Sequence, residues 1–193
     1  LQTALDGKQP AITGTENKVL SIQADGTGVK TGSISDNGTT GFFGNGFVGQ
    51  YESNVKHYHD VLAYDNNTSS ITGMMKIVMP KTWSNTMLTF TIKGYNWVTG
   101  QGAWECIIGG YNYDAVDVWT MYSAEIRGNA PFNRVRLGHD GSRCVIILGE
   151  ATTVWRYPKI IISDLVAGYY NTDGWETGWS ASIITSETGL TNI

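Results

Sequence analysis

The chain is poor in proline, cysteine and long hydrophobic runs, and it carries no excess of positive charge. Its 4 prolines stand beside 24 glycines in 193 residues, which favours many tight turns over a proline-rich linker. The formal net charge of −4 lacks the basic footprint that nucleic-acid binding requires, so we expect no nucleic-acid partner. No run approaches the roughly 18 apolar residues of a membrane span, so we expect no membrane insertion.

The two cysteines, Cys106 and Cys144, lie in apolar, strand-like runs. Neither belongs to a CxxC pair, so a metal or redox site has little support. We expect buried free thiols that behave as small hydrophobic side chains. A disulfide between two core strands is the alternative.

The first quarter of the chain differs from the rest, because residues 1–50 contain no long apolar run. A segment so poor in apolar side chains cannot offset the entropy of ordering a single chain. We therefore expect residues 1–59 to become ordered by wrapping around the same segment of other copies of the chain. A flexible linker is the alternative. The chain opens without a methionine or a signal-peptide pattern, so we expect a segment of a longer polypeptide. Turn-type dipeptides divide the segment at Asp6-Gly7, Asp25-Gly26, Asn37-Gly38 and Asn45-Gly46.

Residues 60–193 are predicted to form a second, all-β domain. Several segments alternate apolar and polar side chains, as in residues 86–93, which is typical of half-buried antiparallel strands. The run Ile160–Ile162 is apolar on both faces, which indicates a central strand or an interface strand. Strands so closely spaced predict an antiparallel β-sandwich, with a jelly roll as the favoured topology. The eight predicted strands are 74–79, 86–93, 103–108, 118–127, 133–138, 143–148, 159–167 and 178–185.

The chain opens with Leu1-Gln2-Thr3-Ala4-Leu5-Asp6-Gly7-Lys8-Gln9 and continues with Gly14-Thr15-Glu16-Asn17-Lys18-Val19. Its second half contains six short motifs, at Ser70–Gly73, Pro80–Trp83, Gly109–Tyr113, Val135–Gly141, Trp155–Lys159 and Gly174–Trp179. The opening segments resemble repeats in the shafts of bacteriophage tail fibres. The later motifs resemble the carboxyl-terminal heads of such fibres, particularly in phages of Bacteroidetes-type hosts.

This resemblance implies a homotrimer with a slender shaft at residues 1–59 and a distal head at residues 60–193. It places the protein in the virion, on a tail fibre or spike, and outside the cell after phage release. The implied function is non-covalent attachment to a host-surface receptor, either a polysaccharide or an outer-membrane receptor. The alternatives are a purely structural spike or trimerisation cap, and a glycan-degrading tail spike.

Aromatic residues are the main candidates for ligand binding, because 7 tryptophans and 10 tyrosines exceed what a sandwich core of this size needs. Many lie in predicted loops or at strand ends beside Asn and Asp, where a ring stacks on a sugar and the polar neighbours bind its hydroxyls. The alternative is that these rings cap the sandwich or pack between subunits. Trp83 shares this placement, Trp104 and Trp179 are expected in the core, and the burial of Trp119 is open. The candidate ligand-binding residues are Tyr95, Trp97, Tyr111, Tyr113, Tyr169, Tyr170 and Trp175.

His57 and His59 are the candidate metal ligands, because Tyr58 between them places both imidazoles on one face of an extended segment. In a trimer, three such pairs would bring six nitrogens to the axis, which suits an octahedral divalent metal such as Fe or Ni. The adjacent charges of Lys56 and Asp60 favour a solvated linker instead. We expect no other cofactor.

Catalytic signatures are missing from the sequence. Glycan cleavage needs two carboxylates facing each other across a cleft, and the sequence does not pair any of its acids. A GxSxG motif and a phosphate-binding loop are both missing. We therefore expect a protein that is not an enzyme. The acids considered are Glu105, Asp114, Asp117, Glu125, Glu150 and Asp164.

Overall fold

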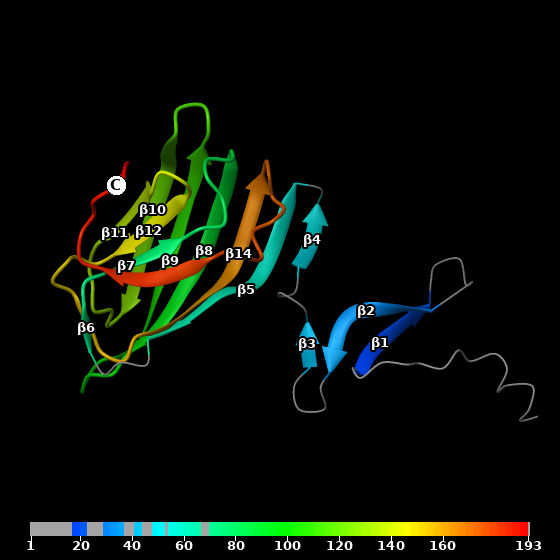
Figure 1. The fold of residues 1–193 in the computed structure, drawn as a ribbon, viewed down its shortest axis with the longest axis horizontal. Coiled ribbons are helices and arrows are strands. Elements are labelled where there is room, and N and C mark those ends of the chain that lie inside the picture. Colours follow the sequence, from blue (N-terminus) through cyan, green and yellow to red (C-terminus); the bar gives the residue numbers. More distant parts are fainter. Residues whose placement is uncertain are drawn as a thin grey trace, which may run out of the picture. The chain divides into compact units, whose positions relative to one another are not determined.

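The structure is a computed structural model that describes residues 17–22, 29–36, 41–43, 48–52, 54–66 and 70–192, with side chains from Asn54 onward. The chain divides into two compact units, Leu1–Gly44 and Asn45–Ile193. All regular elements in the described residues are β-strands (Figure 1). The part of the chain that the structure describes contains no helix whose length and hydropathy would let it cross a membrane.

The first unit contains one three-stranded antiparallel sheet. Strand β2 (Val29–Asp36) lies between β1 (Asn17–Ile22) and β3 (Gly41–Phe43). Short strands therefore form in this segment although it contains no long apolar run. The opening segment with Leu1 and Leu5 lies outside the described residues, as do the predicted turns at Asp6-Gly7, Asp25-Gly26, Asn37-Gly38 and Asn45-Gly46.

The second unit is an antiparallel β-sandwich, which confirms the predicted fold class. Its larger sheet has the strand order β10-β9-β8-β14-β5-β4, and its smaller sheet has the order β11-β12-β7-β15 (Figure 1). A short pair, β13-β6, is separate from both. The large-sheet strands are β4 (Val48–Glu52), β5 (Val55–Asp65), β8 (Thr86–Asn96), β9 (Gly102–Tyr113), β10 (Val118–Gly128) and β14 (Lys159–Tyr169). The others are β6 (Ile71–Thr72), β7 (Met74–Val78), β11 (Val135–His139), β12 (Cys144–Leu148), β13 (Val154–Trp155) and β15 (Ser180–Ile184).

The connectivity matches a jelly roll only in part. Strands distant in sequence pair as a jelly roll requires, β7 with β15 and β8 with β14. The strands between them in sequence do not, because β8, β9 and β10 form a meander in one sheet while β11 and β12 form a hairpin in the other. The meander places two hairpin loops at opposite ends of the same sheet.

All eight strands predicted from the sequence are present, as β7, β8, β9, β10, β11, β12, β14 and β15. The run Ile160–Ile162 belongs to a central strand, because β14 pairs with β5 on one side and β8 on the other. A bulge at Asp164, whose φ of 58° is left-handed, then shifts the phase of the strand, so that Leu165 and Ala167 face inward.

The predicted domain boundary at residue 59 lies inside the sandwich. Strand β5 crosses this position and pairs with β14 from Val55 onward. Tyr58 is buried in the core, and its hydroxyl donates a hydrogen bond to the Thr172 carbonyl oxygen at 2.6 Å. The second unit therefore begins at Asn45 rather than at residue 60.

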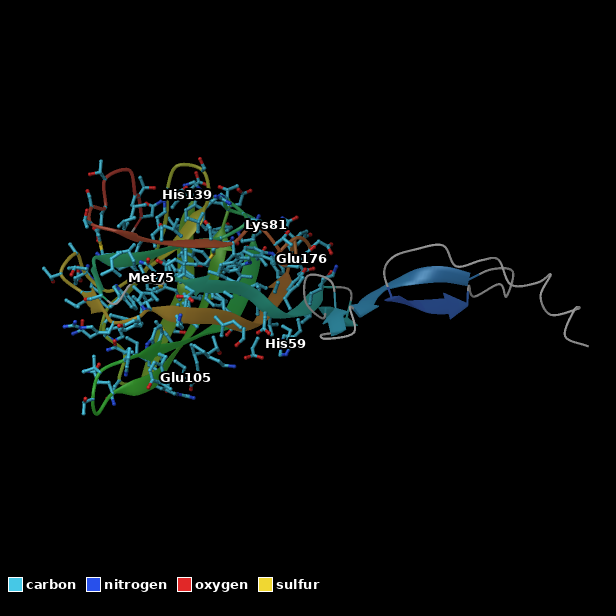
Figure 2. The ribbon with its side chains drawn as sticks, turned by 60° about the horizontal axis from the view of Figure 1, so that its bottom comes forward. His59, Met75, Lys81, Glu105, His139 and Glu176 are labelled. Carbon is cyan, nitrogen blue, oxygen red and sulfur yellow. The ribbon has the colours of Figure 1, made fainter. Side chains whose placement is uncertain are left out.

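The core fills the space between the two sheets. Inward-facing residues of the large sheet, such as Phe90 and Ile92, meet inward-facing residues of the small sheet, such as Ile77 and Ile146. A smaller cluster on the other face of the small sheet contains Val145 and is covered in part by Leu190. In Figure 2, His59 and Glu105 project from the side of the large sheet that faces away from this core.

Both cysteines are free and fully buried, one in each sheet, as the favoured prediction stated. Burial raises the pKa of the Cys106 thiol to about 11 and that of Cys144 to about 12. The thiols are therefore protonated at neutral pH and behave as small hydrophobic groups.

Candidate ligand-binding surface

Six of the seven candidate aromatic residues are at least partly exposed, and they fall into two groups at opposite ends of β8. Tyr111, Tyr113, Tyr169 and Tyr170 lie where β8 begins, because Thr86 pairs with both Asn112 and Tyr169. Tyr95 and Trp97 lie where β8 ends. Eleven residues of extended strand separate the two groups by about 30 Å, so they belong to different surfaces.

The first group forms one continuous aromatic surface, which we call the tyrosine cluster (Tyr111, Tyr113, Tyr169 and Tyr170). The rings of Tyr111 and Tyr113 are stacked with centroids 5.4 Å apart. Tyr169 contacts Tyr111 edge-on at 6.1 Å and Tyr170 at 4.9 Å. Tyr169 and Tyr170 are 52% and 61% exposed, so both rings remain open to solvent.

Strand alternation places Tyr111 and Tyr113 on the outer face, because Asn112 between them points inward and is fully buried. The Asn112 side chain binds the loop that precedes β8 to the sheet. Its Oδ1 accepts a hydrogen bond from the Thr86 amide at 2.7 Å, and its Nδ2 donates to the Ser84 hydroxyl at 3.0 Å. The two outward rings therefore stand on a fixed backbone.

A second set of hydrogen bonds connects the tyrosine-bearing loops to one another. Asn85 Oδ1 accepts from the Tyr111 hydroxyl at 3.1 Å and from the Asp114 amide at 3.0 Å. Asn171 Nδ2 donates to the Ser84 carbonyl oxygen at 2.7 Å. The cluster is thus held in place before any ligand arrives, which reduces the entropy lost on binding.

The loop after β14 has backbone angles that side chains seldom adopt. Tyr169 has a φ of 77° and Asn171 a φ of 49°. Asn tolerates this region, but for an aromatic residue it is a genuine outlier. Such strain persists only where surrounding contacts impose it, and it is often found at binding sites.

Trp175 does not belong to the exposed surface, contrary to the sequence prediction, because its side chain is fully buried. Its Nε1 donates to the Asn171 carbonyl oxygen at 3.0 Å, and the Lys81 ammonium lies 5.3 Å from its ring centroid. Trp175 therefore supports the loop of Tyr169 and Tyr170 from beneath. Trp83 and Trp119 are also buried, and Trp104 and Trp179 are in the core as predicted.

Two residues that the sequence pattern does not single out extend these surfaces. Met87 is 47% exposed and lies directly opposite Tyr111 in the sheet register. The alternation of β8 indicates its outward position, but Met87 is not aromatic and so lies outside the pattern of rings beside Asn and Asp. At the other end, Tyr157 contacts Trp97 with ring centroids 4.5 Å apart.

The phenol group of Tyr111 is a hydrogen-bonding group rather than a charge. Partial burial, together with Tyr169, Tyr113 and Asp114 nearby, raises the pKa of Tyr111 above its ordinary value. A protonated phenol can both donate and accept a hydrogen bond, and its ring offers an apolar face. This combination matches the alternating C–H faces and hydroxyl groups of a sugar.

His57 and His59 lie on the same face of β5, with ring centroids 6.4 Å apart. Asp164 is 4.0 Å from His57 but is engaged by Ser163 and by Lys93, whose contacts lower the pKa of its carboxyl. Among the residues that the structure describes, no group of three or more His, Cys, Asp or Glu side chains could hold a metal ion. A metal shared between three chains remains a prediction.

The chain was compared with protein-family models, with curated proteins and with solved structures, and it matches none of them.

Proposed function

We propose that this chain is the distal part of a phage-type tail fibre, and that its sandwich domain attaches non-covalently to a glycan on the host surface through the tyrosine cluster. The observation that carries the proposal is the contact of four tyrosine rings on a backbone fixed by Asn85, Asn112 and Asn171. Exposed apolar rings of this kind are unfavourable in water unless a partner covers them.

A sugar-binding role is favoured over an apolar partner by the surroundings of the rings. Asp114 and Asp117 are exposed in the β9–β10 hairpin, which projects beyond the sandwich at the end where β14 finishes (Figure 1). Carboxylates and amides accept and donate the hydrogen bonds that sugar hydroxyls need, while the rings take the C–H faces. Each head can bind weakly, since several linked copies on one fibre multiply the apparent affinity.

The test is a glycan array probed with the purified full chain and with Tyr113→Ala and Tyr170→Ala variants. Both variants should lose most of the signal on the uncharged glycans that the unchanged protein binds. The matched control is Tyr95→Ala, the same substitution at a 52% exposed ring at the other end of β8, and it should bind normally.

Two results would contradict the proposal. If the variants bind normally but the mass of the assembly falls, the rings pack between subunits and the protein is a structural cap. If reducing ends accumulate when the protein is incubated with host polysaccharide, the protein is a hydrolase rather than an adhesin.

A further inference from the structure

The opposite end of the sandwich contains an open cavity of about 640 Å³, within the range of small-molecule sites. Three loops form its walls: the β8–β9 hairpin, the β10–β11 connection and the β12–β13 connection. It lies at the end of β8 that is remote from the tyrosine cluster, so an inference about it does not rest on the proposed function.

Asn96, which lines this cavity, has a buried acceptor that no described residue pairs. Asn96 is only 4% exposed, and its Nδ2 donates to the side chain of Gln101. Its Oδ1 is buried and accepts no hydrogen bond from any described residue. Buried polar atoms are nearly always paired, so an unpaired acceptor in a cavity wall marks a place for a donor group of a ligand.

The remaining walls combine polar and apolar groups. Asn133 and Thr152 supply an amide and a hydroxyl, while Phe132 and Val98 supply apolar surface. The Trp97 amide donates to the Arg156 carbonyl oxygen at 3.3 Å, which ties the β8–β9 hairpin to the segment after β13. A cavity with several dispersed hydrogen-bonding groups and apolar patches suits a polyhydroxylated ring.

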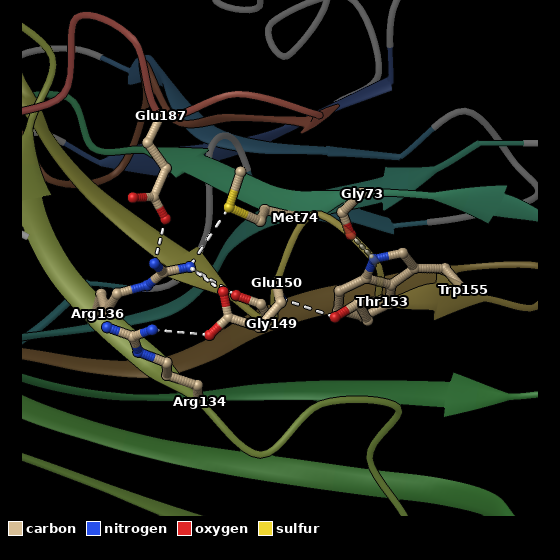
Figure 3. Close-up of polar contacts among 9 residues, drawn as sticks. All are labelled: Gly73, Met74, Arg134, Arg136, Gly149, Glu150, Thr153, Trp155 and Glu187. Carbon is tan, nitrogen blue, oxygen red and sulfur yellow. Dashed lines mark hydrogen bonds and ion pairs between the residues drawn. The ribbon is translucent and has the colours of Figure 1, made fainter.

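The charges around the cavity leave one guanidinium uncompensated. Glu150, in the wall, binds Arg134 at 2.9 Å and lies 3.6 Å from Arg136 (Figure 3). Arg136 also pairs with Glu187. Arg156 is exposed, lines the cavity, and its side chain has no ion pair or hydrogen bond with any described residue.

Arg156 is therefore a guanidinium in the cavity wall that no described carboxylate neutralises. A guanidinium presents its donors as a rigid fork that matches a carboxylate. We propose that this cavity binds a carboxylate-bearing sugar unit, with Arg156 holding the carboxylate and Asn96 Oδ1 accepting a ring hydroxyl.

The experiment uses the full chain labelled with ¹⁵N and titrated with D-glucuronate, D-glucose and acetate. Glucuronate should shift the amide signals of the three cavity loops and leave those of the β9–β10 hairpin unchanged. Glucose should bind more weakly, because it lacks the carboxylate, and acetate more weakly still, because it lacks the ring. Equal binding of glucose and glucuronate, equal binding of acetate and glucuronate, or no shifts in the loops would each overturn the proposal.

The decisive variant is Arg156→Gln, which removes the charge and keeps a polar side chain of similar length. We expect the affinity for glucuronate to fall about tenfold, as for the loss of a charge-assisted contact, while the weak affinity for glucose stays the same. The matched control is Arg143→Gln, the same substitution at the other end of β12, which should bind glucuronate normally. Equal weakening in both variants would show only a general effect of charge and would refute the site.

Failure here is distinguishable from failure of the proposed function. Tyr113→Ala, which tests the tyrosine cluster, should bind glucuronate as the unchanged protein does. Loss of glucuronate binding in that variant would contradict the independence of the two surfaces and with it this assignment.

Discussion

Some tryptophan residues lie on the surface of the sandwich and others lie in its interior. The residues that surround each ring determine whether it is exposed or buried. Trp97 is 62% exposed at the end of β8. Trp104, seven residues later in the chain, packs edge-on against Phe132 at 5.1 Å and lies 6.3 Å from Trp155. Two tryptophans so close in sequence therefore have different roles.

Replacement by alanine should separate these roles. Trp104→Ala and Trp175→Ala should each lower the free energy of unfolding by about 3–5 kcal/mol, because a large buried ring leaves a cavity. Trp97→Ala should change it by only about 0.5 kcal/mol, as is usual at the surface. Urea unfolding followed by circular dichroism measures the difference. A large loss in Trp97→Ala would show that this ring is a packing residue.

Asp140 shows how a single carboxylate stabilises a hairpin. Its Oδ2 accepts from Lys76 Nζ at 2.8 Å, and its Oδ1 accepts from the amides of Ser142 and Arg143 at 3.1 and 2.9 Å. Burial alone would raise the pKa of this carboxyl. The three donors outweigh burial and hold the pKa at about 2, below the ordinary 3.8.

The carboxylate form of Asp140 is therefore more stable in the folded state than in the unfolded state. This stabilisation is fully present above pH 3.8 and is lost as the pH falls through about 2. At neutral pH, Asp140→Asn should cost about 1–2 kcal/mol. Thermal unfolding of the unchanged protein and of Asp140→Asn should be measured from neutral to acid pH. The difference between their melting temperatures should become smaller as the pH falls. A constant gap would contradict the assignment.

At the scale of elements, local alternation predicted most strands but not all. The β8 pattern of Leu88, Phe90 and Ile92 inward needs no tertiary information, and the strand lies where the sequence places it. Strand β5 was assigned in part to a shaft, because its charged and histidine side chains and a bulge between Asp60 and Leu62 obscure the alternation. Its membership in the sandwich depends on pairing with β14, about a hundred residues later.

The candidate surface was predictable to a similar extent. Tyrosines in loops beside Asn and Asp were identified correctly as exposed or partly exposed. Trp175 also lies in a predicted loop, as these tyrosines do, yet the path of its loop places the ring beneath Asn171. The burial of a loop side chain is decided by this path, which no local pattern encodes. The cavity at the other end is not predictable from local sequence, because its walls come from three segments that are distant in the chain.

The contact between β8 and β9 offers a test at this scale. The ring of Trp104 lies directly over Gly94, so that a Cβ at position 94 would overlap ring atoms. The ring cannot retreat, because Phe132 and Trp155 pack against it. Gly94→Ala should therefore cost about 1–3 kcal/mol, as overpacking usually does.

The matched control is Gly109→Ala in β9, where the nearest atom to the added Cβ is 3.6 Å away. Its free energy of unfolding should change by about 0.5 kcal/mol or less. Both values come from urea unfolding. If Gly94→Ala is as stable as the control, the close packing of Trp104 over the strand is wrong.

At the scale of the whole molecule, the two units differ in how much they can stabilise themselves. The unit from Asn45 to Ile193 has an extensive core with residues such as Ile92 and Ile146 fully buried. The unit from Leu1 to Gly44 has a single three-stranded sheet among its described residues and a sequence poor in apolar side chains. A three-stranded sheet is stable by itself only when it has a hydrophobic face to bury, and a sequence this poor in apolar side chains offers little of one.

We therefore expect the first unit to be stabilised by other copies of the same chain. Light scattering on the full chain should give about three times 21.1 kDa at micromolar concentration, whereas the fragment 45–193 should remain a folded monomer. A monomeric full chain would contradict the trimer. If the fragment also forms a trimer, the subunits meet on the sandwich itself. The unpaired edge strand β10 would then be the first place to examine, because it exposes Met121 and Tyr122.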